Sequence, residues 1–259
     1  MLVIAHRGFS SQYTQNTADA FAQALLLDID AIELDIHQVE DEFMVFHDPY
    51  VNKLTNGKGR IFDMSLSEVR QLLINDKDPI PTLSQIAALV GNQVILNIEV
   101  KSLQSVKQFV DYVKNIIETY QCQVLISSFD HPVLMAVKAS FTDFTEHAPF
   151  QTSPAQRFSS SEKALSSEKS PLVEFGALIA HSPFDHAKYA SSLGVSVAAT
   201  DWNTVNADFV EDAHKRGMKV WCYTVNHEQT LLELMAMGVD GIFTDRPDWA
   251  KQVINSQVP

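Results

Sequence analysis

The stretch AIELDIHQVEDEFMVFHD, residues 31–48, combines the pattern of a buried strand with two closely spaced acids. Its first residues alternate between two faces, with aliphatic side chains on one face and Glu33 and Asp35 on the other. If the aliphatic face packs against helices, the two acids must point to the opposite side of the sheet. The pattern therefore predicts a strand of an α/β protein that directs carboxylates into an interior.

Short apolar runs alternate with helix-like segments along the whole chain, as expected for βα units around a parallel sheet. We expect core strands near residues 2–6, 31–36, 94–100, 123–128, 177–181, 195–200, 219–224 and 241–244. Helical spacing marks residues 16–27, 105–120, 132–141, 185–193, 206–217 and 227–238 between them. Eight such strands in about 250 residues predict a single TIM (β/α)8 barrel domain spanning residues 1–259.

Two segments are longer than the βα pattern requires. Residues 37–91 contain the EFMVFHD run, the turn-prone LTNGKGR and capping-box starts at Ser65 and Thr82, so we expect a small insertion after the second strand that carries His47. Residues 143–176 contain SSEK twice in a polar setting, which indicates a surface excursion. Within it, FTEHAPF is compatible with a short strand or a loop.

The third expected strand, VILNIEVK at 94–101, repeats the acidic pattern of the second. Glu99 shares its inward face with Asn97 and Lys101, near the carboxyl end where TIM barrels place their active sites. Three converging carboxylates would raise one another's pKa values unless a cation neutralised them, and oxygen ligands suit a hard divalent ion. We therefore predict that Glu33, Asp35 and Glu99 bind one Mg²⁺ or Ca²⁺. The alternative is that the acids form salt bridges with Arg or Lys at the barrel rim.

Histidine and cationic residues accompany these acids. His6 and Arg7 end the first strand, and Gly8 allows a sharp turn after them, while His47 follows the acidic second strand. Two imidazoles with ordinary pKa values can divide the removal and delivery of protons that phosphoryl transfer requires. Arg7 and Lys101 would then hold an anionic phosphate.

The chain also contains a series of short motifs in a fixed order: HRG, NT at 16–17, ELD, HD, NIEVK, SSF at 127–129, YTVN at 223–226 and GVDGIFTDRP at 238–247. This ordered set resembles the glycerophosphodiester phosphodiesterases over nearly the whole chain. The resemblance implies a TIM barrel with an insertion after its second strand. It also implies metal-dependent hydrolysis of glycerophosphodiesters to sn-glycerol 3-phosphate and an alcohol.

Site roles follow from the resemblance position by position. It implies that His6 and His47 form the acid/base pair and that Glu33, Asp35 and Glu99 bind the metal.

The same resemblance implies that Arg7 and Lys101 contact the phosphate and that Phe129 and Tyr223 form walls of a glycerol pocket. The chain departs from the family pattern where PENT is replaced by TQNT, which puts Gln15 in the place of a glutamate. The substitution removes one negative charge beside the site.

Composition limits the partners. A net charge of −13 repels nucleic acid and anionic membrane surfaces, so we expect a small-molecule substrate and no nucleic-acid partner. A membrane-spanning segment needs about 18 consecutive apolar residues, and no apolar run approaches this length. The amino terminus lacks the pattern of a secretory signal peptide. We therefore expect no stable membrane insertion and a cytoplasmic location, whereas the oligomeric state is not determined by these features. Cys122 and Cys222 lack metal-ligand spacing and are expected to be buried free thiols.

Three further residues have structural interpretations that we favour. His37 is expected on the surface or as a hydrogen-bonded core residue, and Trp221 in the core. Asp245, at the end of the eighth expected strand, is expected to cap a helix or form a salt bridge at the rim.

Two alternative functions are compatible with parts of this pattern. A lysophospholipase D would use the same site but would need an apolar groove for an acyl chain. A non-catalytic binding barrel would be expected to have lost a carboxylate or an imidazole of the site, and all five are present.

Overall fold

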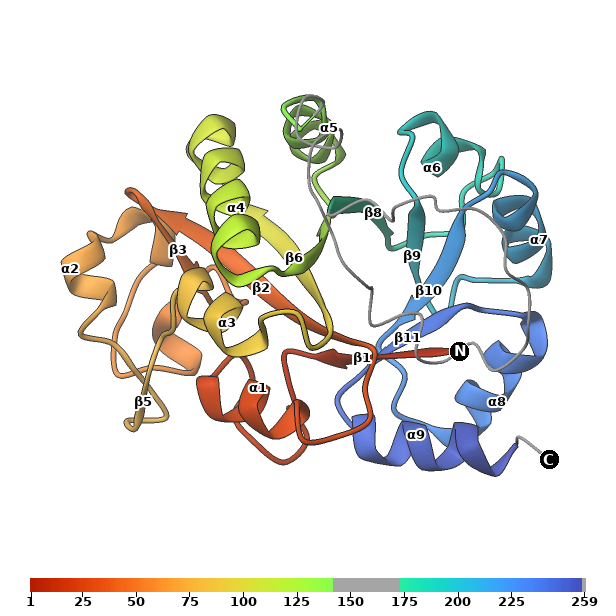
Figure 1. Ribbon diagram of the computed structural model, residues 1–259, viewed down its shortest axis with the longest axis horizontal. Helices are drawn as coiled ribbons and strands as arrows, with labels where there is room; N and C mark the ends of the chain where they lie inside the picture. The colour runs from red at the N-terminus through yellow and green to blue at the C-terminus, as the bar shows by residue number, and fades with distance from the viewer. Residues whose placement is uncertain (142–172, 258–259) are drawn as a thin grey trace.

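The computed structural model describes residues 1–141 and 173–257. Eight parallel strands close into a barrel, and each pairs with its neighbours in chain order (Figure 1). They are β1 (Leu2–His6), β2 (Ala31–Val39), β6 (Ile95–Ser102), β7 (Gln123–Ser128), β8 (Val173–Ile179), β9 (Val197–Asp201), β10 (Lys219–Tyr223) and β11 (Gly241–Thr244). The predicted TIM barrel is confirmed.

Two strand boundaries differ from the predictions by three residues or more, and the others agree within two residues. β8 begins at Val173, four residues before the expected start, because apolar residues at its beginning directly follow a polar stretch that obscures the pattern. β2 continues to Val39, beyond the expected end, because its last residues pair with the antiparallel strand β3 (Glu42–Val45) and are buried.

Helices surround the barrel at each of the positions predicted from spacing (Figure 1). They are α1 (Ala18–Ala24), α4 (Val106–Tyr120), α5 (His131–Ala139), α6 (Lys188–Ser192), α7 (Ala207–Lys215) and α8 (Glu228–Met237). The helix α3 (Leu83–Val90) starts with the predicted capping box at Thr82. The final helix α9 (Pro247–Ser256) was not predicted, and it begins with the proline that is favoured at a first helical position.

The barrel has an apolar floor and a polar mouth. Inside it, Ile4, Leu125, Trp221 and Phe243 belong to one buried cluster, which confirms the core position predicted for Trp221. A larger apolar cluster fills the layer between strands and helices and contains Cys122 and Cys222, which are buried free thiols as predicted. Because these apolar side chains fill the barrel interior, polar site residues can gather only at the carboxyl ends of the strands.

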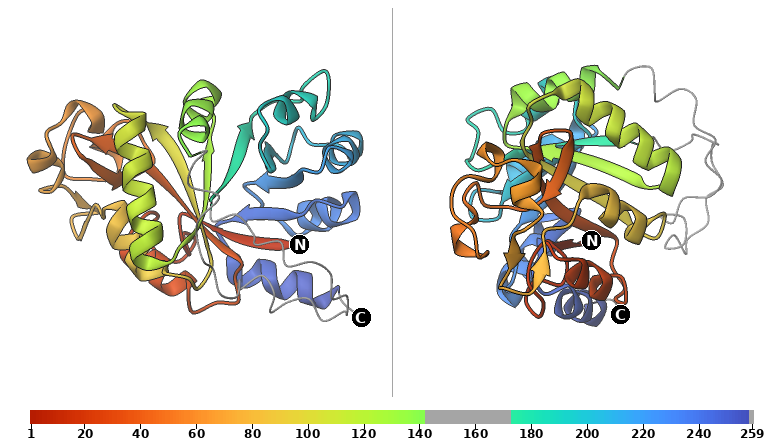
Figure 2. Two further views of the ribbon diagram at one scale, coloured as in Figure 1. Left: turned by 45° about the horizontal axis from the view of Figure 1, so that its top comes forward. Right: turned by 90° about the vertical axis from the view of Figure 1, so that its left-hand side faces the viewer.

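The segment between β2 and α3 lies to one side of the barrel, next to β2 (Figure 2). It contains β3, the 3-10 turns η1 (Val51–Lys53) and η2 (Ile61–Asp63), α2 (Leu66–Val69), β4 (Leu73–Ile74) and β5 (Asp78–Pro79). The predicted capping box at Ser65 is formed. This segment has its own buried apolar cluster, including Met44, Phe46 and Ile61. The division of the chain into one domain with an insertion at 37–91 remains a prediction.

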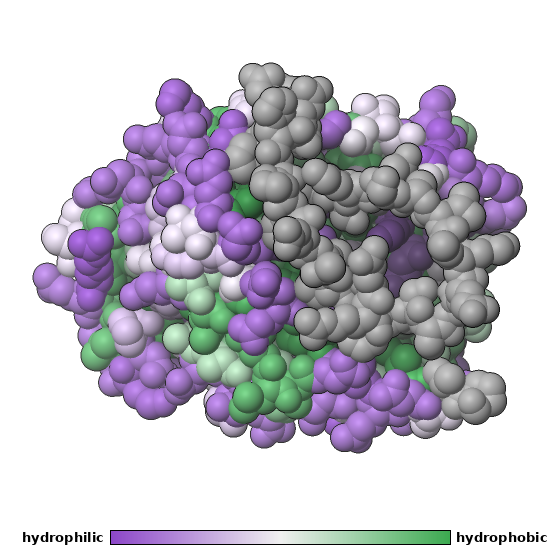
Figure 3. Space-filling view, viewed as in Figure 1, coloured by the Kyte–Doolittle hydropathy of each residue, from purple (hydrophilic) through white to green (hydrophobic). Residues whose placement is uncertain are grey.

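Most of the predicted excursion at 143–176, including FTEHAPF, lies outside the described residues. Within the described part of the chain, none of the helices has the length and apolar character needed to cross a bilayer. The face drawn in Figure 3 is largely hydrophilic outside its grey region, with a hydrophobic area over α1. Leu26, which follows that helix, is 76% exposed.

The turn after β1 sets the position of the first site residues. Arg7 and Gly8 both have left-handed backbone conformations, with φ angles of 56° and 82°. A side chain at Gly8 would place its Cβ 2.7 Å from the carbonyl carbon of Ala20 in α1. The glycine thus allows both the turn and the close approach of α1.

We predict that Gly8→Ala destabilises the protein by at least about 2 kcal/mol, through backbone strain and the clash with α1. Gly238→Ala is the matched control, because Gly238 has a φ of 83° and a Cβ at this position would have no atom within 4 Å. The control should lose only about 1 kcal/mol. Equal losses in urea unfolding would contradict the importance of the close approach.

Candidate active site

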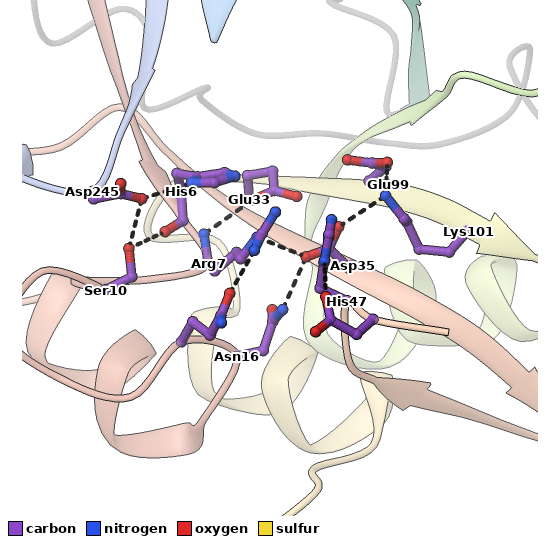
Figure 4. Close-up of polar contacts among 12 residues, drawn as sticks. His6, Arg7, Ser10, Asn16, Glu33, Asp35, His47, Glu99, Lys101 and Asp245 are labelled. Atoms are coloured by element: carbon purple, nitrogen blue, oxygen red, sulfur yellow. Dashed lines mark hydrogen bonds and ion pairs between the residues drawn. The ribbon is translucent and has the colours of Figure 1, made fainter. Parts of the chain in front are cut away.

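Three carboxylates meet in the mouth of the barrel (Figure 4). Glu33 and Asp35 extend from β2, and the parallel register places Asp35 beside Glu99 of β6. The nearest side-chain oxygens of the three acids all lie within 4.8 Å of one another. Period-two alternation on adjacent strands therefore brings together the acids predicted from the sequence.

Two cations partly neutralise this cluster. Arg7 Nε lies 3.1 Å from Asp35 Oδ2, and its backbone N–H donates to Glu33 Oε2 at 3.0 Å. Lys101 Nζ lies 2.6 Å from Glu99 Oε1 and 3.7 Å from Asp35 Oδ1. The salt bridges of the alternative interpretation are therefore present, but they link the acids to residues of the same mouth.

The pKa values of the acids separate according to these contacts. Burial, reinforced by the neighbouring carboxylates, raises the pKa of Glu33 well above its usual value and that of Glu99 to about 7. Burial also acts to raise the pKa of Asp35, but the charges of Arg7, His47 and Lys101 outweigh it and the net pKa is lowered. Of the three acids, Asp35 is therefore the one that neighbouring side chains of the protein keep ionised.

The donor set fits a divalent cation. Glu33 Oε1 and Asp35 Oδ1 are buried oxygens that accept no hydrogen bond. A buried carboxylate oxygen without a donor is costly, and a bound cation would remove that cost. Oxygen-only ligands favour a hard ion such as Mg²⁺ or Ca²⁺.

His6, at the end of β1, is paired with Asp245, which follows β11. His6 Nδ1 donates to Asp245 Oδ1 at 2.7 Å, which leaves Nε2 of His6 for other partners. Ser10 Oγ donates to the same oxygen at 2.9 Å, and Asn226 Nδ2 donates to Oδ2 at 2.7 Å. Burial acts to raise the pKa of Asp245, but these hydrogen bonds and the charge of His6 hold it at about 2.

His47 has a similar arrangement. Its Nδ1 donates to Asp48 Oδ1 at 2.6 Å, and burial lowers its pKa despite the opposing effects of Asp35 and Asp48. His37 donates from Nε2 to the backbone oxygen of His47 at 3.2 Å and accepts from Ser102 Oγ at 2.8 Å. Burial lowers the pKa of His37 to about 4, so it remains a neutral core residue, one of the two roles expected of it.

A cavity of about 190 Å³ connects these groups. Its lining includes all the predicted site residues except Asp35, which lies fully buried beneath it. Phe129 and Tyr223 meet edge to face at 5.7 Å and form an aromatic wall, with Lys101 Nζ 5.8 Å from the Phe129 ring centre.

Gln15, in the TQNT stretch, accepts a hydrogen bond from Arg7 Nη1 at 2.5 Å. A neutral amide thus orients the guanidinium without neutralising its charge.

Several residues of the site were missed in the sequence. Asp245 was expected to be a helix cap or to form a salt bridge at the rim. Its Oδ1 lies 2.7 Å from Nδ1 of the predicted catalytic His6, while Arg246 is the N-cap of α9. Asp48 was visible in the HD motif without an assigned role. Asn16, within the NT motif, donates to Asp35 Oδ2 at 2.9 Å. For Asp48 and Asn16, the short HD and NT motifs were the signal that the sequence offered.

Comparison with known proteins identifies the family. The Glycerophosphoryl diester phosphodiesterase family matches residues 6–249, so the chain belongs to this family. It is 29% identical to a glycerophosphodiester phosphodiesterase of Caldanaerobacter subterraneus subsp. tengcongensis, with 95% of each chain covered. It is also 29% identical to a glycerophosphodiester phosphodiesterase of Bacillus altitudinis, with 97% of each chain covered.

Solved structures share the fold. A phosphodiesterase of Oleispira antarctica in complex with the product sn-glycerol-3-phosphate superposes with a TM-score of 0.80 at 22% identity, covering 98% of this chain and 97% of the other. A glycerophosphodiester phosphodiesterase of Parabacteroides distasonis superposes with a TM-score of 0.75 at 20% identity, covering 100% and 98%.

We predict that divalent cations stabilise the protein more at about pH 8 than at about pH 5.5. The pKa of Glu99 rises from 4.5 to about 7 in the folded state. Its contribution to stability is therefore complete below pH 4.5 and is lost as pH rises through about 7, where a cation replaces the proton.

Thermal unfolding in chelator and in Mg²⁺ or Ca²⁺ measures this effect. Glu99→Gln should stabilise the metal-free protein at about pH 8 and lose most of the rise in Tm caused by cations. Glu118→Gln, an exposed acid of α4, is the control and should behave as wild type. A full cation response in Glu99→Gln would contradict the assignment of this acid.

Proposed function

We propose that this phosphodiesterase hydrolyses glycerophosphodiesters to sn-glycerol 3-phosphate and an alcohol, with a divalent cation bound by Glu33, Asp35 and Glu99. When bound, Mg²⁺ or Ca²⁺ would supply positive charge that stabilises the negative charge of the phosphate and of the attacking and leaving oxygens. Arg7 and Lys101 bind the remaining phosphate oxygens, Arg7 through its planar guanidinium and Lys101 as a point charge.

His6 and His47 divide the proton transfers. One imidazole accepts the proton of the attacking hydroxyl, and the other donates a proton to the oxygen of the departing alcohol. Asp245 and Asp48 bind Nδ1 of the two rings, so each ring presents Nε2 to the reaction. Both histidines line the same cavity as Glu33 and Glu99, and the described lining of this cavity includes no cysteine.

The glycerol hydroxyl next to the ester is the favoured nucleophile. When glycerol lies against the aromatic wall formed by Phe129 and Tyr223, this hydroxyl is held near phosphorus, and an intramolecular attack needs no ordering of a separate water. The attack forms a cyclic phosphate and releases the alcohol, and water then opens the ring to give sn-glycerol 3-phosphate.

The observation that carries the proposal is one cavity lined by two histidines, each fixed by an aspartate, and by Glu33 and Glu99, with Asp35 buried next to these two acids. Family membership over residues 6–249 supports the substrate class. The product complex of the Oleispira antarctica phosphodiesterase supports sn-glycerol 3-phosphate as the retained half.

Release of sn-glycerol 3-phosphate from a panel of diesters tests the proposal. Chelation should abolish turnover, and Mg²⁺ or Ca²⁺ should restore it. His6→Ala and His47→Ala should each lower kcat at least about 100-fold, while His214→Ala, in the outer helix α7, should not. A lysophosphatidylcholine in the same panel tests the lysophospholipase D alternative, and exclusive cleavage of that lipid would overturn the proposal.

We also predict that Asp245→Asn lowers kcat at least about 100-fold with little change in KM. The carboxylate fixes the His6 tautomer with a proton on Nδ1, and an amide that donated to Nδ1 would select the opposite tautomer. The acidic limb of the pH–rate profile should shift in this variant, which a purely structural defect would not cause. Unchanged kcat would exclude a positioning role for Asp245.

A further inference from the structure

A second cavity, which we call the polar groove, adjoins the catalytic cavity. It is lined by residues 10–15 of the loop after β1 and by Asn75, Asn226, Asp245 and Arg246. Its volume is about 720 Å³, and it shares His6 and Arg7 with the catalytic cavity of about 190 Å³. A diester with its phosphate at Arg7 can therefore place one ester arm in each cavity.

Three distant parts of the chain hold the groove together. The backbone N–H of Ser11 donates to the carbonyl oxygen of Asp245 at 3.0 Å, which attaches the loop after β1 to the end of β11. Asn75 Nδ2 donates to Thr14 Oγ1 at 3.1 Å, which brings the β4–β5 turn onto the same loop. Asn75 and Asp76 both have left-handed backbones in that turn, with φ angles of 50° and 57°.

The groove is rich in neutral hydrogen-bonding groups. Hydroxyl and amide side chains come from Ser11, Gln12 and Asn75, all of which are exposed. Such groups donate and accept hydrogen bonds and match alcohols with several hydroxyls.

The charges of the groove disfavour a cation. Both oxygens of Asp245 accept hydrogen bonds from the protein, Oδ1 from His6 and Ser10 and Oδ2 from Asn226. Arg246 contributes a positive charge, with its Cζ 5.0 Å from the Trp249 ring centre. A quaternary ammonium head group would meet Arg246 and a carboxylate that is already bound, with Tyr13 as the one phenyl-type ring in the described lining.

The two cavities differ in size and lining, and the two halves of a glycerophosphodiester differ in a corresponding way. The small cavity has aromatic walls and suits the constant glycerol half, whereas the polar groove is wide and open and suits the half that varies. We propose that the polar groove binds the departing alcohol and selects uncharged, polyhydroxylated head groups over quaternary ammonium head groups. This inference rests on the proposed function, because it concerns the same reaction.

Competing diesters with a common product test the selectivity. Wild-type kcat/KM for glycerophosphoglycerol and glycerophosphoinositol should exceed that for glycerophosphocholine by roughly tenfold or more, as expected for one or two net hydrogen bonds. Released sn-glycerol 3-phosphate measures all three reactions with one assay. The ratio of Kd values for the same diesters, measured by calorimetry on His47→Ala, gives the selectivity without turnover.

Two variants of the groove should change this ratio. Asn75→Gly removes the amide but retains the left-handed turn, and it should lower the preference for glycerophosphoglycerol severalfold. Arg246→Glu replaces the cation by a carboxylate and should shift the ratio toward glycerophosphocholine by roughly tenfold. Lys77→Ala is the matched control in the β4–β5 turn, since Lys77 pairs with Asp19 and Asp78 outside the groove.

Equal kcat/KM and Kd values for the three diesters, or a preference for glycerophosphocholine, would overturn the inference and leave the proposed hydrolysis intact. A ratio that Arg246→Glu does not change would also overturn it. If no diester were hydrolysed, the proposed function would fail, and the Kd ratio on His47→Ala would still decide whether the groove selects polyhydroxylated head groups.

Discussion

The burial of three carboxylates in one barrel mouth is the constraint on which the rest of the site depends. The β2–β6 register leaves Asp35 and Glu99 side by side, and a medium with little water cannot support their charges without partners. Arg7 and Lys101 provide two positive charges against three acids. A dication in addition would give the mouth an excess of positive charge, which is the condition for binding a phosphodiester anion.

Closure of the barrel connects this electrostatic problem to the proton transfers. His6 and Asp245 are 239 positions apart, yet β1 and β11 are neighbours only because the sheet closes. The imidazole orientation therefore depends on the same strand pairing that completes the fold. His47 depends instead on a local contact with Asp48 and on His37, so the two imidazoles have independent supports.

Sequence patterns were sufficient where the physical cause is periodic or local. Alternation placed Glu33, Asp35 and Glu99 on inward faces, and capping boxes at Ser65 and Thr82 marked two helix starts. They were insufficient where the cause is tertiary. The pairing of Asp245 with His6 requires barrel closure, and the polar groove requires three separate segments to meet. Residue spacing within one segment cannot predict such contacts.

The net charge of −13 makes local recognition necessary. At physiological ionic strength charges are screened over about 8 Å, so the acidic surface repels a phosphodiester weakly at a distance and the mouth must attract it at contact. Arg7 meets this need because its partner Gln15 is a neutral amide, which binds the guanidinium without neutralising its charge. Asp35 is the only carboxylate that pairs with the Arg7 side chain among the described residues, so more of the guanidinium charge remains for the substrate than if a second acid were bound to it.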